Sequence, residues 1–412
     1  MFSKERGVRM KIPPHSKETV GIVKEDLEIG RNSIIRGEGT PPKIVVEGLI
    51  VCRGRVLFES DVEARGIEGE EDAIEIRGNL IVENSVTVED GSLYIHGNLK
   101  ATRIDIDNSL RVRGNTEAEE IKVGRSLETI GEITADKIVV GGTFEAKSDV
   151  KAEEIKVGGT LEIKGKVSVT DINVGRSAEL SNGNVSGSIK VGGSLETEGF
   201  LKFEEIKVGG SARVKTGEGR IIKVGGTLEI DEDIKFEKIK VGGTLKIRGK
   251  AEGSSIIVGG TLNSKQSIKL EEDFSVGGTA KVEGVLDASN IKVGGILEAR
   301  EVKGKKVSIG GKVETVEGIR AEQFEIGRRG EVLGPIHAKV VIVNRKATVE
   351  DVYAEEIRMK RGSSARNLYG KRIYIDDECR IYGEIKYTEE LVIGEDVTLA
   401  KSPEKVDSLE NI

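Results

Sequence analysis

The feature that most constrains the fold is a short motif that recurs at an almost constant spacing. Thirteen times between residues 123 and 328, the chain places an aliphatic residue before Gly and then Gly or Arg. Successive copies lie about 17 residues apart, and the step varies by no more than about one residue in either direction. Such a period is typical of a solenoid, in which each repeat forms one coil that stacks on the next. The aliphatic positions are Val123, Val140, Val157, Val174, Val191, Val208, Val224, Val241, Val258, Val276, Val293, Ile309 and Ile326.

The apolar residues within one coil predict strands. After Val157 they fall at Leu161, Ile163, Val167, Val169 and Ile172, in pairs spaced by two. Alternation at period two indicates strands whose apolar side chains face a core, and no long run shows the 3.6-residue period of an amphipathic helix. The sequence therefore predicts an all-β fold, a β-helix of triangular coils of about 17 residues whose strands form three short parallel sheets.

Glycine marks one bend of every coil. The first Gly after the aliphatic residue is present in all thirteen copies, whereas the second is replaced by Arg125, Arg176 and Arg328. We therefore expect the first position to need a positive φ or to lack room for a Cβ atom. The second position is expected to tolerate a side chain.

The period extends beyond the regular copies and sets the expected domain organisation. Downstream, Val343, Met359, Ile375 and Ile393 continue at nearly the same step. Upstream, the segments at 27–30 and 44–47 are separated by the same period, but the stretch 47–103 gives no clear register. We expect one continuous β-helix over residues 20–400, less regular at 20–105 and regular at 106–343. Residues 1–19 and 401–412, which contain Pro13, Pro14 and Pro403, are expected to be flexible tails.

The composition points to a highly charged surface of mixed sign. The net charge is −7 with 33% charged residues, and Glu columns run beside columns of Lys and Arg on the outward positions. Opposite charges in neighbouring columns offset the repulsion within each column, so these columns predict a solvated surface or a face for a partner. Nothing basic enough for nucleic acid stands out. Abundant Lys and Glu with only Gln266 and Gln323 is a bias seen in thermophile proteins.

The residue types that carry chemistry are scarce and scattered. The three histidines, His15, His96 and His337, lack Cys or Asp partners at metal-ligand spacing. No phosphate-binding loop or nucleophile motif is present, so no catalytic, cofactor-binding or metal-binding residue is predicted. Cys52 and Cys379 are far apart in the repeat and are expected to be reduced. With no signal peptide and no apolar span of about 18 residues, a cytoplasmic protein is expected.

One part of the chain resembles a known family. The sequences Phe-Glu-Ile-Gly at 324–327, Gly-Glu-Val-Leu-Gly-Pro-Ile-His-Ala at 330–338, Tyr-Gly-Glu-Ile at 382–385 and Leu-Val-Ile-Gly-Glu at 391–395 resemble the rhythm of the bactofilins, a polymer-forming cytoskeletal family. The similarity is best over residues 319–400. It implies a right-handed β-helix that assembles end to end into filaments without nucleotide and acts as a scaffold. The start of the chain, with Met1 and Phe2, is similar to membrane-contacting segments of that family.

These observations favour a non-enzymatic structural or scaffold protein that associates with itself. A terminal coil exposes unpaired strand edges, which must pair with another chain or be covered. The candidate end coils contain Leu27 and Ile29 at one end and Val392 and Ile393 at the other. The resemblance adds the cytoplasmic membrane surface, or a protein attached to it, as a second candidate partner. Two alternatives stay open: a carbohydrate-active or acyl-transferring β-helix enzyme, and a rod-shaped binding protein or adhesin that does not polymerise.

Overall fold

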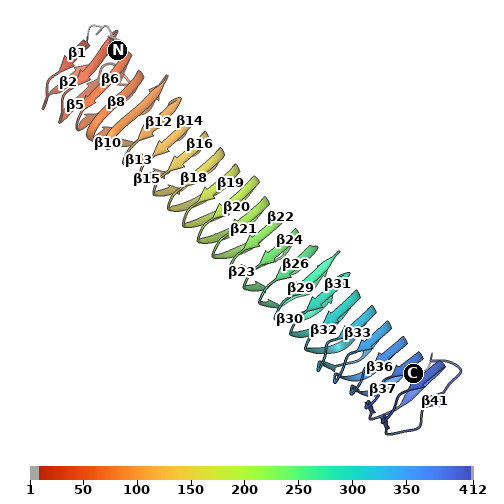
Figure 1. Cartoon of the computed structure of the whole chain (residues 1–412). Helices are drawn as coiled ribbons and strands as arrows, with labels where there is room; N and C mark the ends of the chain where they lie inside the picture. The colour runs from red at the N-terminus through yellow and green to blue at the C-terminus, as the bar shows by residue number, and fades with distance from the viewer. Residues whose placement is uncertain (1–8, 410–412) are drawn as a thin grey trace, which may run out of the picture. The chain divides into compact units, whose positions relative to one another are not determined.

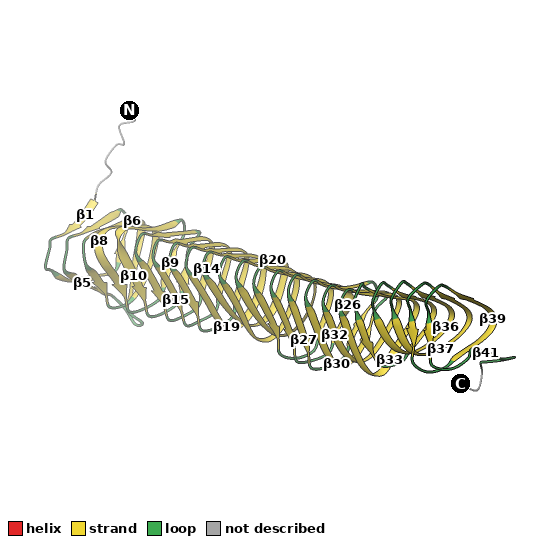
Figure 2. Cartoon of the chain, turned by 60° about the horizontal axis from the view of Figure 1, so that its bottom comes forward, coloured by secondary structure: helices red, strands yellow, loops and turns green. Residues whose placement is uncertain are grey.

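The computed structural model describes residues 9–409, which form strands, turns and loops without a helix. The chain divides into two compact units, Met1–Val208 and Gly209–Ile412. In each unit, strands from successive coils lie side by side and pair in parallel (Figures 1 and 2). The predicted fold class, an all-β parallel solenoid with a spacing of ~17 residues, is therefore confirmed.

Unit 1 contains the first 21 strands. Their bounds are β1 (Arg9–Ile12), β2 (Lys17–Val20), β3 (Ile22–Val23), β4 (Asp26–Ile29), β5 (Ser33–Gly37), β6 (Lys43–Arg53), β7 (Val56–Phe58), β8 (Asp61–Ile76), β9 (Leu80–Val82), β10 (Ser85–Ile95), β11 (Leu99–Lys100), β12 (Arg103–Ile106), β13 (Ser109–Val112), β14 (Thr116–Val123), β15 (Ser126–Thr129), β16 (Ile133–Val140), β17 (Thr143–Ala146), β18 (Val150–Val157), β19 (Thr160–Val174), β20 (Ser177–Val191) and β21 (Ser194–Val208).

Unit 2 contains the remaining strands. Their bounds are β22 (Ser211–Val224), β23 (Thr227–Ile230), β24 (Ile234–Val241), β25 (Thr244–Ile247), β26 (Ala251–Val258), β27 (Thr261–Ser264), β28 (Ile268–Leu270), β29 (Asp273–Val276), β30 (Thr279–Asp287), β31 (Asn290–Val293), β32 (Ile296–Ile309), β33 (Lys312–Ile326), β34 (Glu331–Leu333), β35 (Ile336–Val343), β36 (Thr348–Met359), β37 (Ser364–Ile375), β38 (Arg380–Ile381), β39 (Ile385–Ile393), β40 (Thr398–Leu399) and β41 (Glu404–Lys405).

The core of each coil is built from the predicted apolar pairs. In the coil that begins at Val157, the side chains at 157, 161, 163, 167, 169 and 172 are all buried. Each pair lies directly beside the corresponding pair of the next coil; for example, Leu161 and Ile163 pair with Ala178 and Leu180. The core residues of one coil therefore lie against those of the next. Stability therefore depends on contacts between neighbouring coils.

The structure decides between the two explanations for the first glycine of the repeat. Gly158 has no positive φ, but a Cβ atom at this position would lie 2.2 Å from the carbonyl oxygen of Gly141 in the preceding coil. The glycine is required by close backbone approach and not by a left-handed conformation. At the second position, a Cβ atom on Gly159 would lie 2.6 Å from the oxygen of Gly142. This distance is longer than at Gly158 but still too short for a Cβ atom unless the backbone shifts, so the three copies with Arg must turn this corner with a slightly different backbone.

In the coils toward residue 9 and toward residue 409, the corner equivalent to the Gly-Gly corner has a different backbone conformation. The residue three positions after the last core residue of the strand has a positive φ at His15, Asn32, Arg329, Lys346, Glu378 and Asp396. The Gly-Gly corners of the regular repeats contain no such left-handed residue. Glu71, Asp72 and Asp90 also have positive φ angles, so left-handed residues occur at further corners of unit 1. The type in which the third residue after the core position is left-handed is found in early coils of unit 1 and in the last coils of unit 2.

The structure supplies the register that the sequence left open. In the strand register, Ile29 lies beside Cys52, Cys52 beside Gly69, and Gly69 beside Val88. The step in residue number from Ile29 to Cys52 is much longer than the repeat, whereas the two following steps are close to it. The long first step contains an extra loop closed by a bridge between Glu38 and Lys43. The expected equivalence of 27–30 with 44–47 is wrong, because β3 and not β4 pairs with residues 45–46. Downstream, the expected alignment of residues 343, 359, 375 and 393 is confirmed.

Both expected tails are shorter than the sequence suggested. Residues 9–12 and 17–20 form β1 and β2, which pair with β4 and β5, so the coils begin before residue 20. At the other end, β41 pairs with residues 386–387 of β39, so residues 404–405 belong to a coil. Backbone pairing explains both corrections, since strands at an edge can form with few buried side chains. Residues 1–8 and 410–412 lie outside the described part of the chain.

Candidate functional site

The last coil of unit 2 presents a strand edge whose outer side is not covered by any strand of the described residues. Residues 390–393 of β39 pair on their inner side with residues 372–375 of β37. Within residues 9–409, no strand pairs with their outer side; β41 reaches only residues 386–387. The next strand of this coil, β40, likewise pairs on one side, with β38. Unpaired N–H and C=O groups of this kind form a template for another strand.

Apolar side chains are uncovered along the same edge. Val392 is 47% exposed and Ile393 is 40% exposed, whereas the equivalent core residue of the preceding coil, Ile375, is 2% exposed. Leu391 and Leu399 are partly exposed as well. The predicted end-coil residues Val392 and Ile393 therefore do lie at an open edge. Ile393 faces the core side of the strand, like Ile375 in the preceding coil, and Val392 faces outward, because side chains alternate along a strand.

The last coil is acidic. Between residues 385 and 403, four carboxylates (389, 390, 395 and 396) face two lysines (386 and 401), which gives a net charge of −2. Glu389 is paired with Arg372 at 3.0 Å, and Glu390 accepts a hydrogen bond from the Tyr374 hydroxyl at 2.8 Å. The edge therefore combines uncovered apolar groups with negative charge.

The first coil of unit 1 presents the complementary kind of edge. Within the described residues, β1 and β2 each pair on one side only, with β4 and β5. Met10 is 40% exposed although its neighbour in the next coil, Leu27, is buried. Between residues 9 and 20, Arg9, Lys11 and Lys17 face only Glu18, so the net charge is +2 with a neutral His15.

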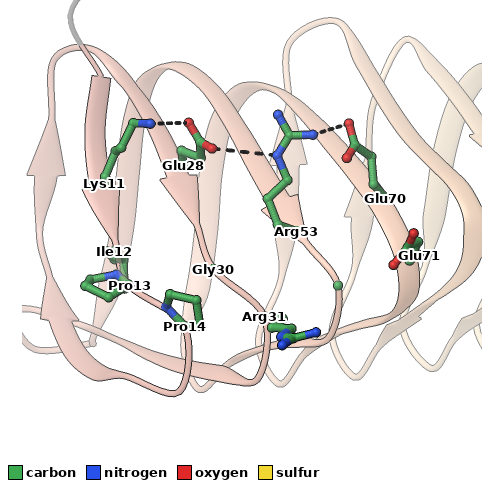
Figure 3. Close-up of a pocket in the computed structure, with 11 residues that line it drawn as sticks. Lys11, Ile12, Pro13, Pro14, Glu28, Gly30, Arg31, Arg53, Glu70 and Glu71 are labelled. Carbon is green, nitrogen blue, oxygen red and sulfur yellow. Dashed lines mark ion pairs between the residues drawn. The ribbon is translucent and has the colours of Figure 1, made fainter.

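Ion pairs organise one face of this first coil. Glu28 lies between Lys11 at 3.4 Å and Arg53 at 3.7 Å, and Arg53 continues the chain of charges to Glu70 (Figure 3). Burial of Glu28 opposes its ionisation, but the neighbouring cations, Lys11 foremost, hold the pKa of its carboxyl below the ordinary value. A hollow of about 610 Å³ lies beside this chain. Its three basic and three acidic residues balance, so it has no net attraction for an anion or a cation.

The other predicted candidates do not lie at an edge. Leu27 and Ile29 are fully buried on β4, which pairs with β1 on one side and with β6 on the other. The expectation that they form the end coil is wrong, because β1 adds one more coil outside them. Met1 and Phe2, the predicted membrane-contacting residues, lie outside the described part of the chain.

The titratable groups are dispersed over the surface. Among residues 9–409, no group of three or more His, Cys, Asp or Glu side chains is arranged to hold a metal ion. His96 lies 3.2 Å from Glu75, and His337 points outward as expected. Cys52 and Cys379 are free and buried, and burial raises the pKa of the Cys52 thiol to about 12. Many carboxylates lie against Lys or Arg across neighbouring coils, which favours the interpretation of the charged columns as a solvated surface.

Two side-chain ladders were missed by the sequence analysis. The rings of His337, Tyr353 and Tyr369 stack on successive coils of unit 2, with centroids 4.6 Å and 4.9 Å apart. In unit 1, the backbone N–H of Asn98 donates to the Asn79 side-chain oxygen, and that of Asn115 donates to Asn98, each at 2.8 Å. The spacing within both ladders follows the repeat, which was the available signal.

Comparison with family models, curated proteins and solved structures finds no match of any of the three kinds. The geometry of the two edges is therefore the basis for a functional interpretation. None of the described residues belongs to a helix long and apolar enough to cross a membrane.

Proposed function

We propose that this protein is a non-enzymatic structural protein that associates with copies of itself through its open end coils, without nucleotide. The observation that carries the proposal is the outer edge of β39, with which no described strand pairs at residues 390–393 and along which Val392 and Ile393 are half-exposed. A strand edge that combines unpaired backbone groups with apolar side chains is stabilised by adding another strand. The resemblance to bactofilins supports the same function from the sequence.

Scaffolding in the cytoplasm, at or near the membrane, follows from the same resemblance. Within each unit, the charged outward columns repeat at the strand spacing of about 4.8 Å, and association of copies would bring many such surfaces together. An assembly of this kind can hold several copies of a membrane-associated partner. The segment around Met1 and Phe2 is the proposed membrane contact.

Sedimentation velocity of the purified protein tests self-association directly. Between about 0.1 and 50 µM, the weight-average sedimentation coefficient is expected to rise with concentration, by mass action. Addition of ATP, GTP or EDTA is expected to leave the curve unchanged. A single species with the mass of one chain at every concentration would overturn the proposal and favour the rod-shaped binding protein.

A further inference from the structure

We propose that the open edge of β39 receives the first coil of a second copy, so that copies join head to tail. This inference rests on the proposed self-association and adds which end meets which, in what register. It is carried by strand direction, by the corner type and by the order of charges along one column.

The two end coils have matching strands. The first coil consists of β1, β2 and β3, and the last consists of residues 390–393 of β39 with β40 and β41. All named strand pairs are parallel. Within residues 9–409, no strand pairs with β1 on the side away from the coil that follows it, or with residues 390–393 of β39 on the side away from the coil that precedes them. Parallel addition of β1 to β39 would continue the same stacking, with one strand available on each of the three faces.

The corners of the two end coils are also of the same type. His15 and Asp396 have φ angles of 60° and 55° and occupy the same position, three residues after Ile12 and Ile393. The regular Gly-Gly corners lack this left-handed residue. A junction between the first and last coils therefore stacks like corners on each other. Pro13 and Pro14 supply no N–H at this corner, so the junction's hydrogen bonds are expected along residues 9–12.

The charges along one outward column alternate, and a head-to-tail junction preserves the alternation. In unit 2, Glu356 lies beside Arg372 on the neighbouring strand, and Arg372 lies beside Glu390 on the next strand. In unit 1, Arg9 lies beside Asp26 on the neighbouring strand, and their charged groups are 3.6 Å apart. Extending both registers places Arg9 of the second copy beside Glu390, so the order is acidic, basic, acidic, basic, acidic. Opposite charges on neighbouring strands stabilise pairing, whereas like charges oppose it.

The same register pairs the uncovered apolar groups. Met10 falls opposite Leu391 and Ile12 opposite Ile393, so the two core residues that are each 40% exposed, Met10 and Ile393, become covered. On the next face, Glu18 falls opposite Leu399, so that face contributes less. A junction of like ends would instead bring two coils of charge +2, or two of −2, together.

Disulfide trapping tests the register. The outward residues Lys11 and Val392 fall opposite each other, and neighbouring strands about 4.8 Å apart are within the range for a disulfide. Two variants, Lys11→Cys and Val392→Cys, are oxidised separately and as a mixture, followed by non-reducing electrophoresis. Linked dimers are expected only in the mixture, and the double variant is expected to give a ladder of higher multiples. Wild type and a mixture of Lys11→Cys with Lys164→Cys, an outward position in a regular coil, serve as controls.

The outcomes separate this inference from the proposed function. Dimers of Lys11→Cys alone, or of Val392→Cys alone, would show pairing of like ends and overturn the head-to-tail junction. Absence of linked species while sedimentation still shows association would also overturn it and leave self-association standing. Absence of both linked species and association would overturn both.

Discussion

Replacing Ile393 with Lys is expected to raise the protein concentration at half-maximal association on the order of a hundredfold. Covering an isoleucine side chain contributes about 1.5–3 kcal/mol when it is fully buried, and about 1.4 kcal/mol changes an equilibrium tenfold. Ile393 is already partly covered, so only part of this contribution is lost. The remaining effect comes from the lysine charge, which a strand added to β39 would bury without a partner. Sedimentation velocity measures the shift.

Ile296→Lys is the matched control. Ile296 lies on β32 in the same unit and is 39% exposed, but it is far in sequence from either end coil. Its replacement adds the same charge at the same exposure, and association is expected to be unchanged. The circular dichroism spectrum of both variants should match that of wild type, because each lysine can reach solvent. Equal association of Ile393→Lys and wild type would mean that the edge of β39 is not the contact.

Gly158→Ala is expected to destabilise unit 1 by on the order of 3 kcal/mol, as overpacking of a tightly packed site does. The added Cβ would lie 2.2 Å from the Gly141 carbonyl oxygen, which is backbone and cannot rotate away. The two coils must move apart, which weakens the hydrogen bond from the Gly158 N–H to the Val140 oxygen, now 2.9 Å. Hydrogen exchange of peptides covering residues 136–175 is expected to be faster in this variant, together with a lower urea midpoint.

The control for this prediction is Gly159→Ala, one residue further along the same corner. Its Cβ would lie 2.6 Å from the Gly142 oxygen, and the same position carries Arg in two other coils of unit 1. A smaller change in exchange and in the urea midpoint is therefore expected. If both variants lose the same stability, close approach at the first glycine is not the reason for its presence in every copy.

The regular coils could be predicted from sequence because every coil repeats the same local solution. Val157, Leu161 and Ile163 alternate in the strand pattern, and each lies beside an equivalent residue of the next coil. The role of Gly158 could be narrowed to two explanations but not decided. The glycine is needed because a carbonyl oxygen of the neighbouring coil lies where a Cβ atom would be, and a sequence does not show the distance between coils.

The end coils were harder to predict because they do not obey the pattern of the interior. In β1, only Ile12 is buried, and charged residues alternate with Met10 on an edge that has a neighbour on one side. Without the glycine corner, this strand looks like a tail. The long step from Ile29 to Cys52 hides the period in the same way, because the extra loop leaves no apolar signature.

The stacked rings of unit 2 show a third limit. His337, Tyr353 and Tyr369 are outward residues, and each alone looks like an ordinary surface side chain. Their contact follows from the register of β35, β36 and β37, which places them on adjacent strands. Outward columns are thus predictable once the register is known, and the proposed junction places Arg9 of one copy beside Glu390 of another by the same reasoning.

Negative-stain electron microscopy of the purified full chain, without nucleotide and over a range of salt concentrations, tests the central claim most directly. The account predicts filaments for wild type and for Ile296→Lys, with few or none for Ile393→Lys at the same concentration. Higher salt is expected to shorten the filaments, because the proposed junction joins oppositely charged coils. Isolated particles of wild type at every concentration and salt would contradict self-association through the end coils.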